Sequence, residues 1–284
     1  MYRFLNAFAE VFDFSGSRVQ IWAHAPTVLV VDAQIHRRPL DEAAINASLS
    51  PYWRVSVVDL TGSTQSDLAK IPELHSGEVL ATEYQSAGRG RLDRNFEATP
   101  MSALLFSMYV HINRPKESWG WLPLLAAQSL RESLSELDSR VEISLKWPND
   151  LLIHDKKVAG LLCESHGQGV IIGVGLNVAM DTVELPVSTA TSLMLQEFGE
   201  LDRNKILVNF LHKFRKDLNK WDSEGSESFI DNYRQHSATL GLEVRVELPD
   251  GRILHSTAVD LSLTGELKLA SGESVMAGDV IHLR

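Results

Sequence analysis

The segment with the clearest chemical potential runs from Glu83 to Arg94 and reads EYQSAGRGRLDR. It concentrates Arg89, Arg91 and Arg94 in a chain whose overall charge is negative. Guanidinium groups bind carboxylates and phosphates through planar, bidentate hydrogen bonds, and the intervening glycines let the backbone approach a ligand closely. The segment therefore predicts an anion site, such as one for a polyphosphate. The alternative is a solvated Gly-Arg hairpin loop.

This segment departs from two common phosphate-binding motifs. Asp93 stands where the dinucleotide fingerprint needs its third glycine, and no Gly-Lys-Ser/Thr follows as in a Walker loop. The predicted anion site is therefore of another kind.

A second segment, residues 146–160, reads KWPNDLLIHDKKVAG. Lys146 alternates with apolar neighbours in a predicted strand, and Lys157 precedes small residues that leave room beside it. A lysine in such a place could neutralise a phosphate or carboxylate in a transition state. Asn149 and Asp150 could bind Mg²⁺ or merely close a turn, and the alternative for the lysines is an ordinary place at hairpin ends.

The third segment is Gly173–Asn177, GVGLN, a predicted strand interrupted by glycine. Glycine inside a strand marks either a bulge or close contact with a ligand or another backbone. The amide of Asn177 offers both a donor and an acceptor for a nucleotide. A plain bulge is the alternative.

Strands and helices are mixed along the chain rather than strictly alternating. Strands are predicted over residues 53–60, 79–85, 103–111, 141–147, 158–164 and 170–178, and helices start at 63–67 and span 121–137, the stripe Leu207 to Trp221, and 226–234. The helix start is placed by the capping-box spacing of Thr64 and Asp67. This order favours an α+β fold with a mixed, largely antiparallel sheet and flanking helices over a doubly wound fold.

The distribution of motifs and predicted elements along the chain indicates three parts. Residues 1–50 form a poorly defined extension, with a possible strand at 28–31 and a helix at 41–49, and show no helix-turn-helix pattern. Residues 51–237 contain the motifs. In residues 238–284, short strands at 244–248, 254–260, 266–269 and 280–283 are separated by turn residues, which indicates a small β-barrel.

Composition excludes several protein classes. Hydrophobic residues make up 44% of the 284 residues, so the chain is globular. Lysine and arginine total 27 against 37 acids, a net charge of −10, which argues against nucleic-acid binding. The single cysteine, Cys163, excludes an intrachain disulfide and a thiolate-rich metal site, the scattered histidines suggest no zinc site, and no apolar run is long enough for a membrane helix. A cytoplasmic protein is expected.

Taken together and in order, these motifs resemble those of the biotin protein ligase family. The shared motifs are Ser63-Thr64, Glu83 to Arg91, Lys146 to Asp150, Lys157 to Gly160 and Gly173 to Asn177. The similarity extends from about Trp53 to the C-terminus, and the tail resembles the small SH3-like domain of that family. Each motif alone is moderately specific, whereas the ordered set is highly specific.

The resemblance implies a reaction in two steps. The carboxylate of biotin attacks the α-phosphate of ATP, which releases pyrophosphate and leaves biotinyl-5′-adenylate. The ε-amine of one lysine on a biotin carboxyl carrier protein or domain, from acetyl-CoA carboxylase or a related carboxylase, then takes the biotinyl group. Biotin, ATP and Mg²⁺ are the implied small molecules, with the metal held through the ATP phosphates and no protein metal ligand assigned.

The resemblance also implies roles for individual residues. Ser63, Thr64 and Gln85 would hold the ureido head of biotin, with Gln65 beside them. Arg89, Gly90 and Arg91 would lie over the carboxylate and phosphate, and Lys157 would contact the reacting oxygens, so that Lys157, Arg91 and Arg89 are the expected catalytic residues. The nucleotide side would comprise Arg94, Phe96, Lys146, Asn149, Asp150 and Asn177.

Three residues depart from the family pattern. Gln65 stands where asparagine is more usual, and Phe96 replaces a tryptophan while keeping a ring face for adenine. Asp93 replaces a glycine and adds a negative charge beside the arginines, which puts the rate and the nucleotide affinity in doubt.

Three alternatives stay open from the sequence. A lipoate–protein ligase would use a related fold and the same adenylation chemistry. A bifunctional ligase and biotin-operon repressor would bind DNA through its N-terminal part. A non-catalytic relative would only bind the ligand, although Lys157 and Arg91 are both present.

Overall fold

The computed structural model describes residues 9–12, 18–21, 36–91 and 94–283. The chain divides into two units, Met1–Asp32 and Ala33–Arg284. In the first unit, strands β1 (Ala9–Phe12) and β2 (Arg18–Ile21) pair in antiparallel fashion. The strand expected at residues 28–31 lies outside the described residues.

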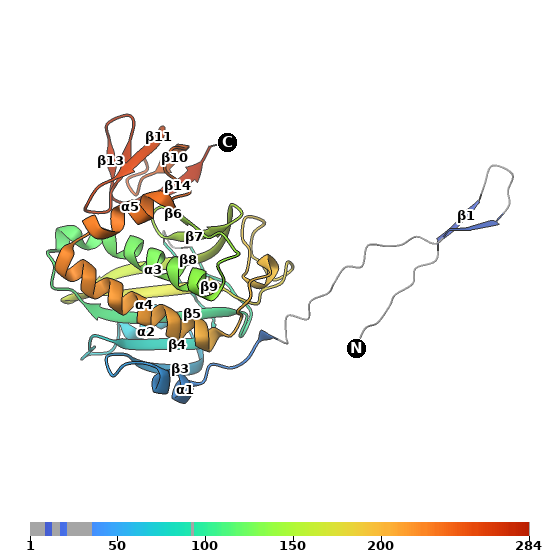
Figure 1. Ribbon diagram of the computed structural model, residues 1–284, viewed down its shortest axis with the longest axis horizontal. Coiled ribbons are helices and arrows are strands. Elements are labelled where there is room, and N and C mark those ends of the chain that lie inside the picture. The colour runs from blue at the N-terminus through green and yellow to red at the C-terminus, as the bar shows by residue number, and fades with distance from the viewer. Residues whose placement is uncertain (1–8, 13–17, 22–35, 92–93, 284) are drawn as a thin grey trace. The chain divides into compact units, whose positions relative to one another are not determined.

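In the described part of the second unit, seven strands form one sheet in the order β3-β4-β5-β9-β8-β7-β6 (Figure 1). Their bounds are β3 Arg54–Thr61, β4 Glu78–Gln85, β5 Ala103–His111, β6 Ser144–Lys146, β7 Asp150–Ile153, β8 Lys156–His166 and β9 Gly169–Asn177. Strands β3 and β4 are parallel, and every other neighbouring pair is antiparallel. The expectation of a mixed, largely antiparallel sheet is confirmed.

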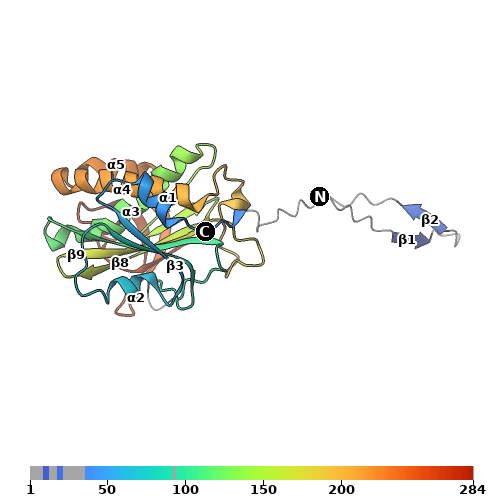
Figure 2. The ribbon, with the colours of Figure 1, turned by 90° about the horizontal axis from the view of Figure 1, so that it is seen from below.

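The helices divide unequally between the two faces of this sheet. One face carries α1 (Glu42–Ser48), α3 (Leu122–Leu137), α4 (Arg203–Glu224) and α5 (Glu227–Gln235), whereas α2 (Thr64–Leu68) lies on the other face (Figure 2). Because side chains alternate along a strand, β5 sends Leu104 and Phe106 into the core beneath the helices. The same strand presents Ser107 to α2, where it bonds with Thr64.

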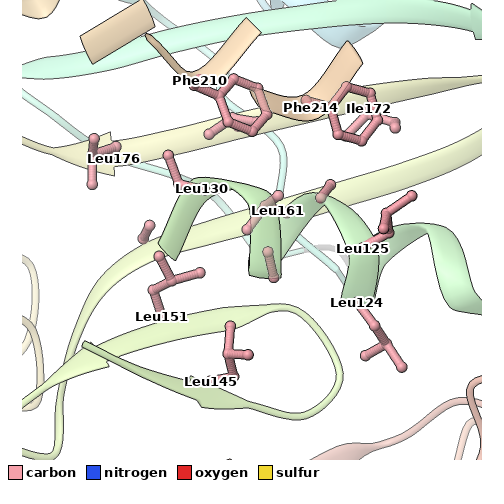
Figure 3. Close-up of a cluster of buried hydrophobic side chains, with 14 of the residues drawn as sticks. Leu124, Leu125, Leu130, Leu145, Leu151, Leu161, Ile172, Leu176, Phe210 and Phe214 are labelled. Carbon is pink, nitrogen blue, oxygen red and sulfur yellow. The ribbon is translucent and has the colours of Figure 1, made fainter. Parts of the chain in front are cut away.

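The core lies between α3, α4 and the sheet, as Figure 3 shows. Its labelled members are Leu124, Leu125, Leu130, Leu145, Leu151, Leu161, Ile172, Leu176, Phe210 and Phe214. The rings of Phe210 and Phe214 stack with centroids 5.7 Å apart. This apolar support fixes the strands, so the opposite face can carry small and polar side chains. None of the helices in the described residues is long and apolar enough to cross a membrane.

The C-terminal part forms a second sheet, in the order β13-β12-β11-β10-β14. The strands are β10 Glu243–Glu247, β11 Ile253–Leu261, β12 Leu267–Leu269, β13 Ser274–Val275 and β14 Asp279–His282, of which β13 was not expected. The pairings leave β13 and β14 at the two ends of this order, so the closed, SH3-like barrel stays a prediction. The backbone of Gly265 lies against Gly120, since a Cβ on Gly265 would stand 2.4 Å from the Gly120 oxygen.

The structure corrects two of the predicted helix and strand boundaries and confirms a predicted helix. Ser63, not Thr64, caps α2, so the expected capping box is wrong by one residue. The strand expected over residues 141–147 shortens to Ser144–Lys146. The helix expected at residues 41–49 is confirmed as α1 and begins after Asp41, whose side chain accepts from the Ala44 amide.

Candidate active site

The first turn of α2 places buried polar side chains beside the end of β4. The Ser63 hydroxyl accepts a 3.5 Å hydrogen bond from the Ser66 amide. Thr64 donates from its amide and hydroxyl to Gln85 Oε1, at 2.8 and 3.0 Å, and its Oγ1 lies 2.8 Å from Ser107 Oγ. Hydroxyl and amide groups can both donate and accept, so this corner suits a polar head group that does both.

Gln65 carries a buried acceptor beside this corner. Its Nε2 donates to the Ile171 oxygen at 3.1 Å, but its Oε1 has no hydrogen-bond partner among the described residues. A Cβ on Gly173 would stand 2.8 Å from that oxygen, so any larger residue there would make the Gln65 side chain shift. A buried unpaired acceptor costs roughly 1–3 kcal/mol, which a ligand N–H would recover.

The three arginines of the loop after β4 bind different partners. Arg89 makes a bidentate pair with Glu164, at 2.7 and 3.0 Å, and Arg94 pairs with Asp279. Arg91 donates to Asn149 Oδ1 at 3.1 Å and to the Gly278 oxygen at 3.2 Å.

Arg91 therefore bonds only neutral oxygens among the described residues. Its burial lowers the pKa of the Arg91 guanidinium, which Asp150 and Asp279 partly oppose. The group still stays protonated at neutral pH. By contrast, the hydrogen bond with Asp279 raises the pKa of Arg94. A cation held away from water and without a carboxylate partner is well prepared to bind an anionic ligand.

Phe96 closes the loop against the sheet. Its amide donates to the Gly88 oxygen at 2.9 Å, and the Gly90 amide donates to the Arg94 oxygen at 2.7 Å. A Cβ on Gly175 would stand 2.6 to 2.9 Å from three carbons of the Phe96 ring. The glycine thus lets the ring lie on β9, where its face can pack against a flat base.

Lys157 enters the same region from the start of β8. Its Nζ lies 2.6 Å from Asp150 Oδ1, and the Lys157 side chain is 42% exposed. A Cβ on Gly160 would stand 2.9 Å from that Nζ. The glycine therefore leaves space for the Lys157 side chain, as the sequence predicts. The backbone is fixed by hydrogen bonds of 2.8 Å to Thr189 and Thr191.

One cavity gathers most of the expected residues. Its lining includes Ser63, Thr64, Gln65, Gln85, Arg89, Gly90, Arg91, Arg94, Phe96, Asn149, Asp150 and Lys157. Lys146 and Asn177 do not line it. Asn177 is buried, and its Nδ2 donates to the Thr191 oxygen at 2.9 Å. Asp93 lies outside the described residues.

Sequence reasoning missed several members of the site. Ser107 extends the polar corner, and its signal was a hydroxyl inside an otherwise apolar strand. Glu164 and Asp279 pair with Arg89 and Arg94. The spacing of the sequence does not predict these two partners, because strand order in the seven-stranded sheet places Glu164 near the loop, and Asp279 belongs to the separate C-terminal sheet.

The described residues hold no cluster of three or more His, Cys, Asp or Glu side chains suited to a metal ion. Burial raises the pKa of the Cys163 thiol to about 12, so the group is a neutral thiol and not a reactive thiolate. The polar groups of the site are amides, hydroxyls, carboxylates and cations, and three of the cations, Arg89, Arg94 and Lys157, pair with carboxylates.

Comparison with known proteins agrees with this geometry. The model of the Biotin/lipoate A/B protein ligase family matches residues 55–180. A biotin–acetyl-CoA-carboxylase ligase of Mycobacterium tuberculosis is 38% identical over 261 residues, which cover 87% of this chain and 97% of that protein. The bifunctional ligase/repressor BirA of Salmonella typhimurium is 32% identical, over 75% of this chain and 68% of that protein. A structure of biotin protein ligase from Aquifex aeolicus in complex with biotin and ATP has a TM-score of 0.70 at 28% identity, covering 81% of this chain and 98% of that one.

Proposed function

This chain belongs to the biotin/lipoate A/B protein ligase family, as a biotin protein ligase, and from that premise we propose how the residues of its cavity act. It activates biotin with ATP and transfers the biotinyl group to a protein. We propose that the acceptor is a lysine of a biotin carboxyl carrier protein or domain, from acetyl-CoA carboxylase or a related carboxylase.

One observation carries the assignment of the reaction centre. Arg91 and Lys157 come from distant parts of the chain and line one cavity together with the first turn of α2. Condensing a carboxylate with a phosphate requires fixed positive charge where the two anions meet. This arrangement supports placing the carboxyl group of biotin and the α-phosphate of ATP between the two cations.

The polar corner would hold the ureido head of biotin. Ser63, Thr64 and Gln85 offer hydroxyl and amide groups to its oxygen and N–H groups. The unpaired Oε1 of Gln65 would accept a hydrogen bond from one ring N–H. A neutral amide serves here as well as the more usual asparagine, because the departure changes side-chain length and not chemistry.

The cations would act by exchanging partners. Arg89 and Lys157 now pair with Glu164 and Asp150, so each would trade a protein carboxylate for an oxygen of the substrates. Gly90 would let the backbone lie over the reacting groups. Arg91 needs no such exchange of a carboxylate, because it bonds only neutral oxygens in the described residues.

The nucleotide would occupy the side of the cavity near the Phe96 ring. Arg94, Phe96, Asn149 and Asp150 line that cavity and support this placement. The roles expected for Lys146 and Asn177 stay predictions, since neither residue lines the cavity.

We propose that Mg²⁺ accompanies ATP. This ion usually takes one or two protein carboxylates and several phosphate or water oxygens, and Asp150, which has a buried Oδ1, is the carboxylate that would suit it. When bound, Mg²⁺ would neutralise phosphate charge. The binding and positioning described above belong to the chain itself.

We also propose that the chain is cytoplasmic and consists of an extension over residues 1–50, a catalytic part over 51–237 and an SH3-like barrel over 238–284. The antiparallel pairing of the C-terminal strands supports the barrel. Leu40 and Ile45 belong to the main core, which supports a close attachment of residues 36–50 to the catalytic part.

The test is pyrophosphate exchange into ATP in the presence of Mg²⁺ and either biotin or lipoate. We expect exchange that depends on biotin and is absent with lipoate. Exchange with lipoate alone would make the chain a lipoate–protein ligase. The repressor alternative is tested by a gel shift with operator DNA and the adenylate, in which we expect no retarded complex.

A further inference from the structure

A second cavity adjoins the proposed reaction centre and is not used by the roles assigned so far. It lies among the 3-10 segment η2 (Lys116–Trp121), β8 and the C-terminal sheet, and its apolar walls include Trp119, Pro123, Trp147, Val170 and Met276. It shares four lining residues with the first cavity, which are Arg91, Asn149, Leu161 and Leu162. The two cavities are therefore neighbours across a common wall.

Polar residues form part of the wall that the two cavities share. There the Arg91 guanidinium donates to Asn149 Oδ1 at 3.1 Å, and both side chains line both cavities. The chain between β13 and β14 also lies between the cavities, because Met276 lines the second cavity whereas Gly278 and Asp279 line the first.

We propose that the second cavity is the route by which the acceptor lysine of the carrier protein reaches the activated biotin, with Trp119 and Met276 at its mouth contacting the carrier. This inference rests on the proposed function. After the first step the adenylate fills the first cavity, so the amine must arrive from another side. The second cavity reaches the same cation, Arg91, that would lie over the reacting groups.

The chemistry of the walls suits a lysine side chain. Its methylene groups would pack on the apolar surfaces of Trp119 and Trp147, as long amphipathic side chains do. At the inner end, the positive charge of Arg91 disfavours a second cation and so lowers the pKa of an incoming ammonium group. The lysine would thus arrive as the neutral amine, which is the nucleophile.

The transfer step then balances as follows. The amine nitrogen attacks the acyl carbon of the adenylate, and a carbon–nitrogen bond forms. The bond from that carbon to the bridging oxygen breaks, and its electron pair leaves with AMP. The proton released from nitrogen passes to water, so the products are the amide and AMP.

The mouth of the second cavity has the character of a protein-binding surface. Met276 is 51% exposed, and Trp119 is partly buried with the Lys116 ammonium 5.5 Å from its ring centre. Tryptophan and methionine are enriched in protein interfaces. These residues adjoin a route to the acyl carbon, so a folded protein that presents a lysine is the occupant that the position favours.

The test compares Met276→Glu with Val259→Glu, using the full chain and the purified, unbiotinylated carrier domain. Both residues belong to the C-terminal sheet region and have similar exposed fractions, 51% and 50%, but Val259 lines neither cavity. Each variant is assayed for biotin-dependent pyrophosphate exchange, for transfer to the carrier, and for transfer to hydroxylamine, a small amine that needs no docking.

We expect Met276→Glu to raise the KM for the carrier about 10-fold, the equivalent of about 1.4 kcal/mol. Exchange and transfer to hydroxylamine should stay as in the original chain, and Val259→Glu should change none of the three. An unchanged carrier KM in Met276→Glu, or an equal rise in Val259→Glu, would overturn the inference alone. Absence of biotin-dependent exchange in the original chain would instead overturn the proposed function.

Discussion

Lys157→Met removes one positive charge from the first cavity while keeping most of the length of the side chain. In the structure, Lys157 Nζ lies 2.6 Å from Asp150 Oδ1, and the lysine side chain is 42% exposed. Ion pairs this accessible to water contribute only about 0–1 kcal/mol to folding. A loss of ~1 kcal/mol lowers the Tm of a chain of this size by roughly 2–4 °C, so the variant should remain folded.

The expected effect on the reaction is much larger. Lys157 would stabilise charge that develops on the carboxyl and phosphate oxygens, and removing one such donor costs about 2.7–4 kcal/mol, or roughly 10²–10³-fold in kcat. The assay is the initial rate of biotin-dependent pyrophosphate exchange at saturating biotin and ATP. Thermal unfolding of the same samples supplies the comparison with stability.

Loss of the lysine also leaves the Asp150 carboxylate unpaired, and its repulsion of phosphate could slow the reaction by itself. The double variant Lys157→Met/Asp150→Asn removes both charges. If Lys157 acts on the reacting oxygens, the double variant stays at least about 100-fold slower than Asp150→Asn alone, and that single variant reports any loss caused by removing the proposed Mg²⁺ ligand. Recovery to within a few fold would assign the loss to the exposed carboxylate, and near-normal exchange by the single variant would refute the role of Lys157.

Further predictions concern packing and charge elsewhere. Gly175→Ala should raise the KM for ATP more than the KM for biotin, because its Cβ would displace the Phe96 ring; an equal change in both KM values would contradict this. Lys213→Met should destabilise the fold by about 3–5 kcal/mol in urea unfolding, because it leaves two largely buried carboxylates, Glu132 and Asp217, without their cation; a loss below about 1 kcal/mol would contradict the argument. Burial alone would raise the pKa of Glu132, but hydrogen bonding and attraction from Lys213 outweigh it and hold that pKa below its ordinary 4.5. The stability that the ionised Glu132 contributes is present above pH 4.5 and is lost as the pH falls through its folded-state pKa. Glu132→Gln should therefore make the free energy of unfolding decline less steeply in acid, and an unchanged decline would refute the assignment.

Much of the fold follows from local patterns in the sequence. The run from Ala103 to His111 is rich in apolar residues, and it forms β5 with the expected bounds. The apolar spacing in Leu122–Leu137 forms α3 one residue later than predicted. These elements are predictable because helix and strand periodicity depend on neighbours in the chain. The start of α2 is less predictable, since Ser63 and Thr64 are both common N-cap residues.

The chemistry of the site was also predictable by residue type, whereas its hydrogen bonds and ion pairs were not. Arginine, lysine and amide side chains near glycines indicate an anion site by residue type, and Arg91 and Lys157 do line one cavity. Their partners depend on strand order within the main sheet and on how the C-terminal sheet packs beside it. Arg89 meets Glu164, 75 residues away, and Arg94 meets Asp279, 185 residues away.

The amino-acid sequence by itself determined most of the secondary structure, the charge and the chemical groups available, because these depend on residues close together in the chain. Only the tertiary structure decided which cations pair with a carboxylate. It also decided that Lys146 and Asn177 do not line the first cavity, and that a second cavity meets the first at Arg91 and Asn149. Those outcomes depend on strand order and on how the two sheets pack. Packing brings together residues that are far apart in the chain, and their spacing in the sequence does not predict that they meet.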